Sequence, residues 1–163
     1  MPAPRLHETL IAERIVELID QNLSAPLSLK VATIGALEFF PALETLGDNV
    51  PAVFVKPSPS TNLERITTGQ TYRIVYNFRL VFVGAFGPNE EIVRSKTVDA
   101  QKIAELLIDN VDLGQLSLPN GQILFSILRS IEWEPPEDNL VASINADLTA
   151  VALNFAVETS SRK

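Results

Sequence analysis

Residues 51–86 decide the fold, and they read PAVFVKPSPSTNLERITTGQTYRIVYNFRLVFVGAF. From Gln70 to Phe86 large apolar side chains recur at every second position, and only Gly84 interrupts the series. That period places them on one face of a β-strand. A strand of this length spans roughly 55 Å at about 3.3 Å per residue, whereas most strands have about five or six residues. We therefore expect a strand that bends sharply, or one that another subunit partly covers.

The residues before this strand predict its partner. Ala52 to Lys56 has the composition of a short buried strand, and Pro57 to Asn62 that of an extended linker. Leu63 to Thr67 is expected to pair back onto the start of the long strand across a turn at Thr68-Gly69. Together these segments predict a long β-hairpin that projects from the domain.

Two segments have the three- and four-residue spacing of amphipathic helices, Leu6 to Leu23 and about Glu91 to Val111. Ser24-Ala25-Pro26 is expected to end the first helix. Ser28 to Gly35 predicts a short strand. Residues 36–46 have helical composition interrupted by Pro41, which indicates a short helix, a break and a turn at 47–49.

The C-terminal part is expected to close the sheet. Ile123 to Trp133 predicts a strand with Ile123, Phe125, Ile127, Ile131 and Trp133 on one face. Residues 134–139 predict a hairpin loop, and Val141 to Val157 a last strand whose apolar face switches midway, as at a bulge. The expected fold is a single α+β domain over 1–163. It has a mainly antiparallel sheet, two amphipathic helices packed on it and flexible ends at 1–4 and 160–163.

Composition limits the function classes. The net charge of −7 and pI near 4.7 argue against a protein that grips nucleic acid by neutralising phosphates. There is no cysteine, so disulfides and thiolate sites are excluded. The start lacks a secretory pattern, and no apolar run approaches the roughly 20 residues that a membrane-spanning helix needs. We expect a soluble chain made in a cytoplasm, without membrane contact.

The sequence offers no constellation for catalysis. His7 is the only histidine and is expected to be exposed near a helix start, without a partner to orient it as a base. The acidic residues Glu132, Glu134, Glu137 and Asp138 lack the spacing of a calcium loop. They are expected to form a solvated loop or to meet basic residues of a neighbour. The sequence therefore predicts no enzyme, with no catalytic residue, cofactor or metal.

The aromatic side chains of the long strand have two interpretations. Tyr72, Tyr76, Phe78 and Phe82 share one parity and could stack on bases, as in proteins that bind single strands. Such a surface needs basic residues on the same face, whereas Arg73 and Arg79 have the opposite parity. Core packing is the favoured role.

The element order, together with PAVFV (51–55) followed by TYRIVYNFRLVFVGAF (71–86), resembles the tail terminator (tail-completion) proteins of tailed bacteriophages. The resemblance spans roughly 6–157. It implies a structural virion protein, assembled in the host cytoplasm, that forms a ring, expected to be a hexamer, on the head-proximal end of the tail tube. Such a ring ends tail polymerisation and joins the tail to the neck.

The implied partners are other copies of this chain, the tail tube protein, a tail sheath where the virion has one, and a neck or connector protein. DNA would pass through the ring without specific binding. The alternatives are a neck, head–tail joining or tail tube protein of the same virion, or a non-viral α+β module that self-associates. The residues predicted at a subunit or tail interface are Arg65, Thr68, Gln70, Tyr72, Arg73, Glu134, Glu137 and Asp138.

Overall fold

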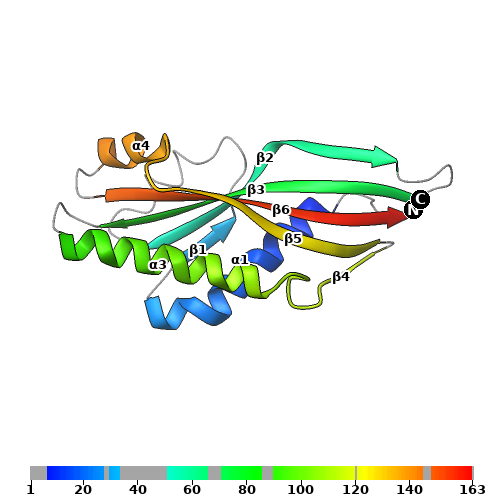
Figure 1. Cartoon of the computed structure of the whole chain (residues 1–163), viewed down its shortest axis with the longest axis horizontal. Coiled ribbons are helices and arrows are strands. Elements are labelled where there is room, and N and C mark those ends of the chain that lie inside the picture. Colours follow the sequence, from blue (N-terminus) through cyan, green and yellow to red (C-terminus); the bar gives the residue numbers. More distant parts are fainter. Residues whose placement is uncertain are drawn as a thin grey trace.

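The computed structural model describes residues 7–27, 30–33, 51–65, 71–85, 90–119, 121–144 and 148–162. Within these ranges the helices are α1 (Glu8–Leu27), α3 (Glu90–Asp109) and α4 (Glu137–Ile144). The strands are β1 (Lys30–Thr33), β2 (Ala52–Arg65), β3 (Thr71–Ala85), β4 (Ser117–Leu118), β5 (Gly121–Glu132) and β6 (Leu148–Arg162). They form one sheet in the order β1-β2-β3-β6-β5-β4, in which only the β1–β2 pair is parallel (Figure 1). The predicted α+β fold with a mainly antiparallel sheet is confirmed.

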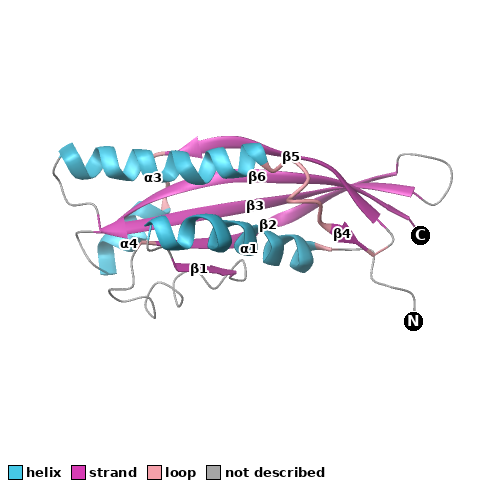
Figure 2. Ribbon diagram, turned by 90° about the horizontal axis from the view of Figure 1, so that it is seen from below, coloured by secondary structure: helices cyan, strands magenta, loops and turns pink. Residues whose placement is uncertain are grey.

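The main core lies between one face of the sheet and the helices α1 and α3, which run along the long strands (Figure 2). As the alternation predicted, the side chains of Ile74, Tyr76, Phe78, Leu80 and Phe82 are buried on this face. The buried residues of α1 and α3 pack against these side chains, and they are Ile11, Ala12, Ile15, Leu18, Ile19, Ala100, Ile103, Ala104 and Leu107. The aromatic side chains described on this face therefore pack in the core, which is the interpretation that the sequence favoured.

A third helix, α4, packs on the opposite face at the end of the sheet that lies away from the β2–β3 turn (Figure 1). Sequence reasoning was wrong here, because it placed a loop at 134–139 and a strand from Val141. Pro135-Pro136 followed by two acidic residues is a helix-start signal, since proline suits the first turn and carboxylates favour the N-terminal end of the helix dipole. Val141 contributes to a second, smaller apolar cluster with Ala52, Phe54, Val81, Val83, Leu148 and Ala150.

Strand β6 (Leu148–Arg162) begins and ends later in the sequence than the predicted Val141 to Val157, and it is more regular than predicted. It pairs with β3 from Ala85↔Leu148 to Thr71↔Arg162 without a register shift, so the predicted bulge within the last strand is wrong. The predicted change of apolar face is found, because Leu148 belongs to the smaller cluster on the α4 face and Val151, Leu153, Phe155 and Val157 belong to the main core. Residues 160–162 are part of this strand and do not form the frayed tail expected there. The long β2–β3 hairpin therefore has β6 beside it over the whole described length of β3.

The predicted linker at 57–62 is also part of a strand. β2 runs continuously from Ala52 to Arg65, with an irregularity in its pairing to β3 between Pro57 and Thr61. Proline cannot donate a ladder hydrogen bond, so Pro57 and the residues after it suit an irregularity of this kind. Figure 1 shows β2 bending there. Pairing of Leu63 with Ile74 is as predicted, and the turn at 68–69 lies outside the described residues.

The helices and the short N-terminal strand lie close to the predicted ranges. α1 continues through Pro26 to Leu27, beyond its predicted end, and β1 lies within the predicted Ser28 to Gly35 strand. α3 ends at Asp109, two residues earlier than predicted. The predictions for 1–4, 36–46 and 47–49 fall outside the described residues.

Two pairing irregularities in β5 divide its apolar side chains between both faces of the sheet. They lie between Ile123 and Phe125 and between Leu128 and Ser130. Each shift reverses the parity of the residues that follow it. The prediction that the apolar side chains of this strand share one face is therefore wrong. Those of Ile123, Leu128 and Ile131 pack toward the core of α1 and α3, whereas Phe125 and Ile127 pair with Glu158 and Ala156 on the other face.

The turn after α3 fixes that helix to α1. Leu113, Gly114 and Gln115 all have positive φ, a left-handed conformation that is costly for residues other than glycine. Arg14 of α1 holds the turn, because its Nε donates to the Leu113 carbonyl at 2.8 Å. A Cβ on Gly114 would lie 2.5 Å from Nη2 of Arg14, so a larger residue would displace the end of the Arg14 side chain, and the φ of 68° would strain it.

Candidate subunit interface

The predicted interface residues of the hairpin lie at the end of β2 and the start of β3. Arg65 pairs with Tyr72 in the strand register, so both backbones belong to the ladder. Nothing is described of the side chains of these two residues, and Thr68 and Gln70 lie outside the described residues. Their proposed role at an interface stays a prediction.

Arg73 is on the sheet face opposite α1 and α3, and its carboxylate partner belongs to its own chain. The guanidinium binds Glu158 of β6 through two hydrogen bonds, one from Nε and one from Nη2 to Oε2 at 2.8 Å. The Glu158 side chain is 11% exposed and that of Arg73 is 40% exposed. This pair joins β3 to β6 near the hairpin end, and its arginine is still accessible to a neighbour.

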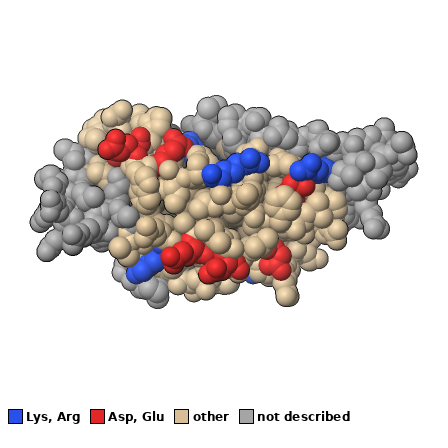
Figure 3. Space-filling view, viewed as in Figure 1, with Lys and Arg blue, Asp and Glu red and all other residues tan. Residues whose placement is uncertain are grey.

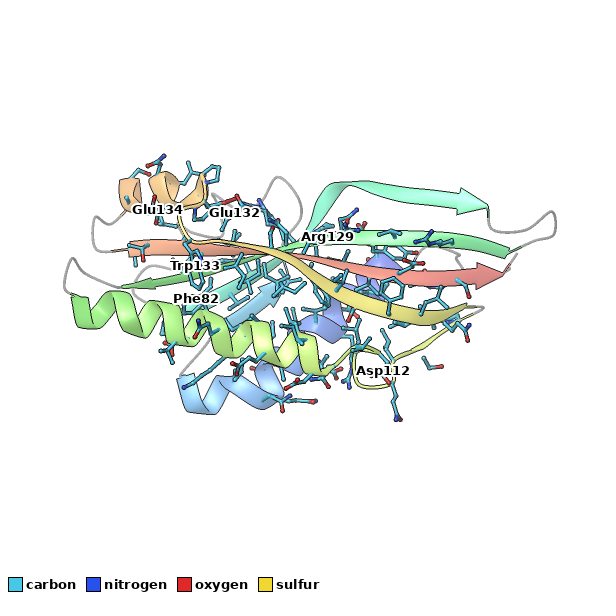
Figure 4. All side chains as sticks on the ribbon, viewed as in Figure 1. Phe82, Asp112, Arg129, Glu132, Trp133 and Glu134 are labelled. Carbon is cyan, nitrogen blue, oxygen red and sulfur yellow. The ribbon has the colours of Figure 1, made fainter. Side chains whose placement is uncertain are left out.

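Two of the three predicted acidic residues hold α4 to the sheet of their own chain. Asp138 Oδ1 accepts a hydrogen bond from the Ala150 N–H at 2.8 Å, beyond the point where β5 pairing with β6 ends at Ala152. Glu137 is buried against Arg79 of β3. Glu134 is exposed, and Figure 4 shows it beside α4.

Arg79 is the centre of a polar cluster that joins α4 to the strands. Its Nε and Nη2 donate to the two carboxylate oxygens of Glu137 at 2.7 and 2.8 Å, and its Nη1 donates to Glu132 and, at 2.9 Å, to Asn154 Oδ1. Asn154 Nδ2 in turn donates to Glu132 Oε2 at 2.6 Å. Lys56 of β2 lies 3.9 Å from Glu137 Oε1. The cluster therefore connects β2, β3, β5 and β6 with the first turn of α4.

The ionisation of these carboxyl groups follows from their partners. Burial alone would raise the pKa of Glu137, but hydrogen bonds from Arg79 and from its own backbone N–H, with the charges of Arg79 and Lys56, lower it. Hydrogen bonds from Arg79 and Asn154 lower the pKa of Glu132. The Arg79 pKa is raised, first by its hydrogen bond to Glu137. All three groups stay charged at neutral pH.

The predicted interface residues of the hairpin and the predicted acidic residues near α4 lie far apart within one subunit. Arg73 and Arg79, which pair with the two sets of carboxylates, are six residues apart on β3. This corresponds to about 20 Å at ~3.3 Å per residue. Both lie on the face that carries α4, and among the described elements only α4 packs there. Much of this sheet face is therefore not covered by the described part of the chain.

Sequence reasoning missed the apolar side chains that are exposed on this face. Phe125 is 41% and Ile127 is 48% exposed, on a strand that pairs with β6 on one side and, on the other, with β4 only at Gly121 and Gln122. Arg129 is exposed close to them and forms no hydrogen bond or ion pair with the residues that the structure describes. Figure 4 places Arg129 near the middle of the sheet. A mixed apolar and basic surface of this kind is typical of a protein contact.

His7 is buried, which contradicts the prediction that it would be exposed. Only 1% of it is accessible, because it lies where α1 begins and its backbone N–H donates to the Tyr76 hydroxyl at 2.9 Å. Neither ring nitrogen forms a well-aligned hydrogen bond with the described residues. Burial lowers the pKa of the His7 imidazole, and the Pro119 backbone carbonyl partly opposes this effect.

This burial predicts that the free energy of unfolding falls as the pH drops below 6.5, the ordinary pKa of histidine. The folded-state pKa is below the unfolded one, so the stabilisation is present above pH 6.5 and is lost as His7 takes up a proton. Urea unfolding at pH 7.5 and 5.5 measures it for the wild type and for His7→Gln. The loss is expected to be smaller in the variant, and an equal loss in both proteins contradicts the prediction.

The described residues contain no group of three or more His, Asp or Glu side chains placed to hold a metal ion. None of the described helices is long and apolar enough to cross a membrane.

Comparison with known proteins shows likeness in the fold alone. No family model matches the chain, and no curated protein matches it. Among solved structures, a chain described as part of the "Virion of native gene transfer agent (GTA) particle" aligns with a TM-score of 0.54 at 12% sequence identity. The alignment covers 93% of this chain and 95% of that chain. The two chains share a fold over nearly their full lengths.

Proposed function

We propose that this chain is a structural protein of a phage-like virion. The observation that carries the proposal is the fold that it shares with a chain of a gene transfer agent virion. That likeness extends over 93% of this chain and 95% of that chain. The proposed role is mechanical and involves no chemical reaction.

Within the particle, we assign the chain to a ring, most simply a hexamer, that caps the head-proximal end of the tail tube. There it ends tail polymerisation and contacts the tube, a sheath where one exists, and the neck protein. The exposed apolar residues of the sheet support self-association, because a monomer gains nothing from Phe125 and Ile127 in water. A heterologous contact repeated around a closed rotation gives a ring of this type.

The first test is imaging. Purified protein is expected to give rings with a central hole under the electron microscope, and particles that carry a tagged copy should bind gold label at one point, where tail meets head. Label along the whole tube would identify a tube protein, and label on the head side of the joint would identify a neck protein. A monomer in solution together with no label on particles contradicts the proposed function.

A second prediction concerns DNA, which would pass through such a ring. We expect the isolated protein to bind duplex DNA with a Kd above about 10⁻⁴ M at physiological salt, which is the weak end of the range for non-specific binding. The reason is that 20 Asp and Glu outnumber 13 Lys and Arg, and that Arg73 and Arg79 are neutralised by carboxylates of the same chain. Fluorescence anisotropy with labelled duplex measures it. Tight binding that weakens steeply with salt contradicts the passage role.

A further inference from the structure

We propose that the exposed sheet patch of one subunit binds the outer ridge of α3 on the next copy of this chain. The sheet patch consists of Phe125, Ile127 and Arg129 of β5. The α3 ridge consists of Val98, Lys102, Glu105, Ile108, Asp109 and Asp112, on α3 and in the turn after it. This inference rests on the proposed ring and names the surfaces that form it.

The sheet patch has an apolar part and an exposed positive charge. Ile127 and Phe125 expose about half of their side chains beside Ala156 and Glu158 of β6. The register shift at Leu128/Ser130 leaves Arg129 outside the ladder, where it forms no ion pair with the described residues. A second protein surface that covers this patch needs apolar contact area and at least one carboxylate.

The α3 ridge has the matching chemistry. Ile108 is 56% and Val98 is 47% exposed on the side of the helix that faces away from the core. Residues at three- and four-residue steps lie along one line of a helix, so these apolar side chains alternate there with Lys102, Glu105 and Asp109. With Asp112, the ridge carries three carboxylates and one lysine. Its net charge is therefore negative where that of the sheet patch is positive.

The two surfaces lie on different parts of one subunit, so they can only meet between copies. Figure 3 shows Lys and Arg side chains near the middle of the sheet face, and a row of Asp and Glu side chains along the lower edge, where Figure 1 draws α3. A contact between two different surfaces is head-to-tail, and repetition of it closes a ring or grows a filament. Two sheet patches facing each other across a two-fold axis would instead bring two copies of Arg129 into one interface, where like charges repel.

Charge reversal tests the contact from either side. Arg129→Glu is expected to weaken self-association by about ten-fold or more, and so is Glu105→Lys/Asp109→Lys, because each reversal sets like charges against each other. Analytical ultracentrifugation over a concentration series measures the association. The matched control is Glu13→Lys/Asp20→Lys, which reverses two exposed carboxylates of α1 outside both surfaces. It should assemble like the wild type.

Mixing gives the more decisive result. An equimolar mixture of Arg129→Glu and Glu105→Lys/Asp109→Lys is expected to reassemble, because every contact in an alternating ring then joins unlike charges. The triple variant should assemble by itself for the same reason. A two-fold contact between sheet patches predicts instead that the α3 variant assembles normally by itself and that the triple variant assembles no better than Arg129→Glu.

The outcomes separate this inference from the proposed function. If the wild type forms rings and both charge-reversal variants form them equally well, the inference is wrong and the proposed ring role is unaffected. If the wild type stays monomeric and particles with a tagged copy bind no gold label, both the inference and the proposed function are wrong. A circular dichroism spectrum and melting temperature equal to those of the wild type establish that each variant is folded before its association is measured.

Discussion

Replacing Phe155 by alanine is expected to lower the free energy of unfolding by about 3–5 kcal/mol, the range for aromatic-to-alanine changes in a close-packed core. Phe155 is 1% exposed on β6 and lies directly across from Phe78 of β3, and both side chains belong to the main core. Strand pairing fixes the two backbones, so the surroundings can collapse only partly into the cavity. Urea denaturation monitored by circular dichroism measures the loss.

The matched control is Phe125→Ala, the same chemical change on the neighbouring strand. Phe125 is on the opposite face and is 41% exposed in the single subunit, so at concentrations where the protein is monomeric this change should cost less than about 1 kcal/mol, as expected for surface positions. Equal losses in the two variants would mean that Phe125 is covered in solution, for example by a second copy. The concentration dependence of the Phe125→Ala effect separates that case, because only a subunit contact makes the loss depend on protein concentration.

The long strand could be predicted because its two faces differ strongly. On β3 the side chains of Ile74, Tyr76 and Phe78 face a core, while Arg73 and Arg79 alternate with them. Such a pattern fixes the register, because a shift by one residue would bury both arginines. The antiparallel hairpin follows from the same reasoning.

Strand β5 could not be placed from its alternation, because two local irregularities reverse the parity. Apolar side chains occupy both faces of this strand, and neither Leu128 nor Phe125 marks in the sequence where the extra residue falls. The surface at Phe125 and Ile127 was missed for this reason. An exposed apolar side chain and a buried one are identical in the sequence, so only the packing of the other elements separates them.

The acidic residues were misplaced for a different reason. Glu137 and Asp138 were interpreted as parts of a loop because the helix that they begin has only eight residues and follows two prolines. Their partners, Arg79 and the Ala150 N–H, are 58 residues before and 12 residues after them in sequence. Contacts at such separations depend on the sheet order, which local patterns do not specify.

The polar cluster around Arg79 supports the second large prediction, a loss of about 2–3 kcal/mol in the free energy of unfolding for Arg79→Met. Removal of one partner of a buried ion pair costs about 3–5 kcal/mol because the other charge is left without compensation. The value is smaller here because 19% of the Arg79 side chain and 38% of that of Glu132 are exposed to water. Glu137 is the group most affected, since its side chain is only 10% exposed.

Two further variants test whether the loss comes from an unpaired carboxylate. Arg129→Met removes an exposed arginine without a partner among the described residues, and it should change stability by less than about 0.5 kcal/mol. Adding Glu137→Met to Arg79→Met should recover part of the loss, because no charge then stays buried without its partner. If the double variant is less stable than Arg79→Met, the carboxylate is not the cause.

The pH dependence gives an independent measure of the same interaction. The pKa values of Glu132 and Glu137 are lowered in the folded protein from an ordinary 4.5, so their stabilisation is present above pH 4.5 and is lost as the pH falls through the folded values. In Arg79→Met the buried Glu137 carboxyl lacks its main partner and binds a proton more readily. The difference in stability between wild type and variant should therefore narrow as the pH is lowered from 7 to 3.5. A difference that stays constant over this range would mean that Arg79 stabilises α4 through packing of its aliphatic part, and not through its charge.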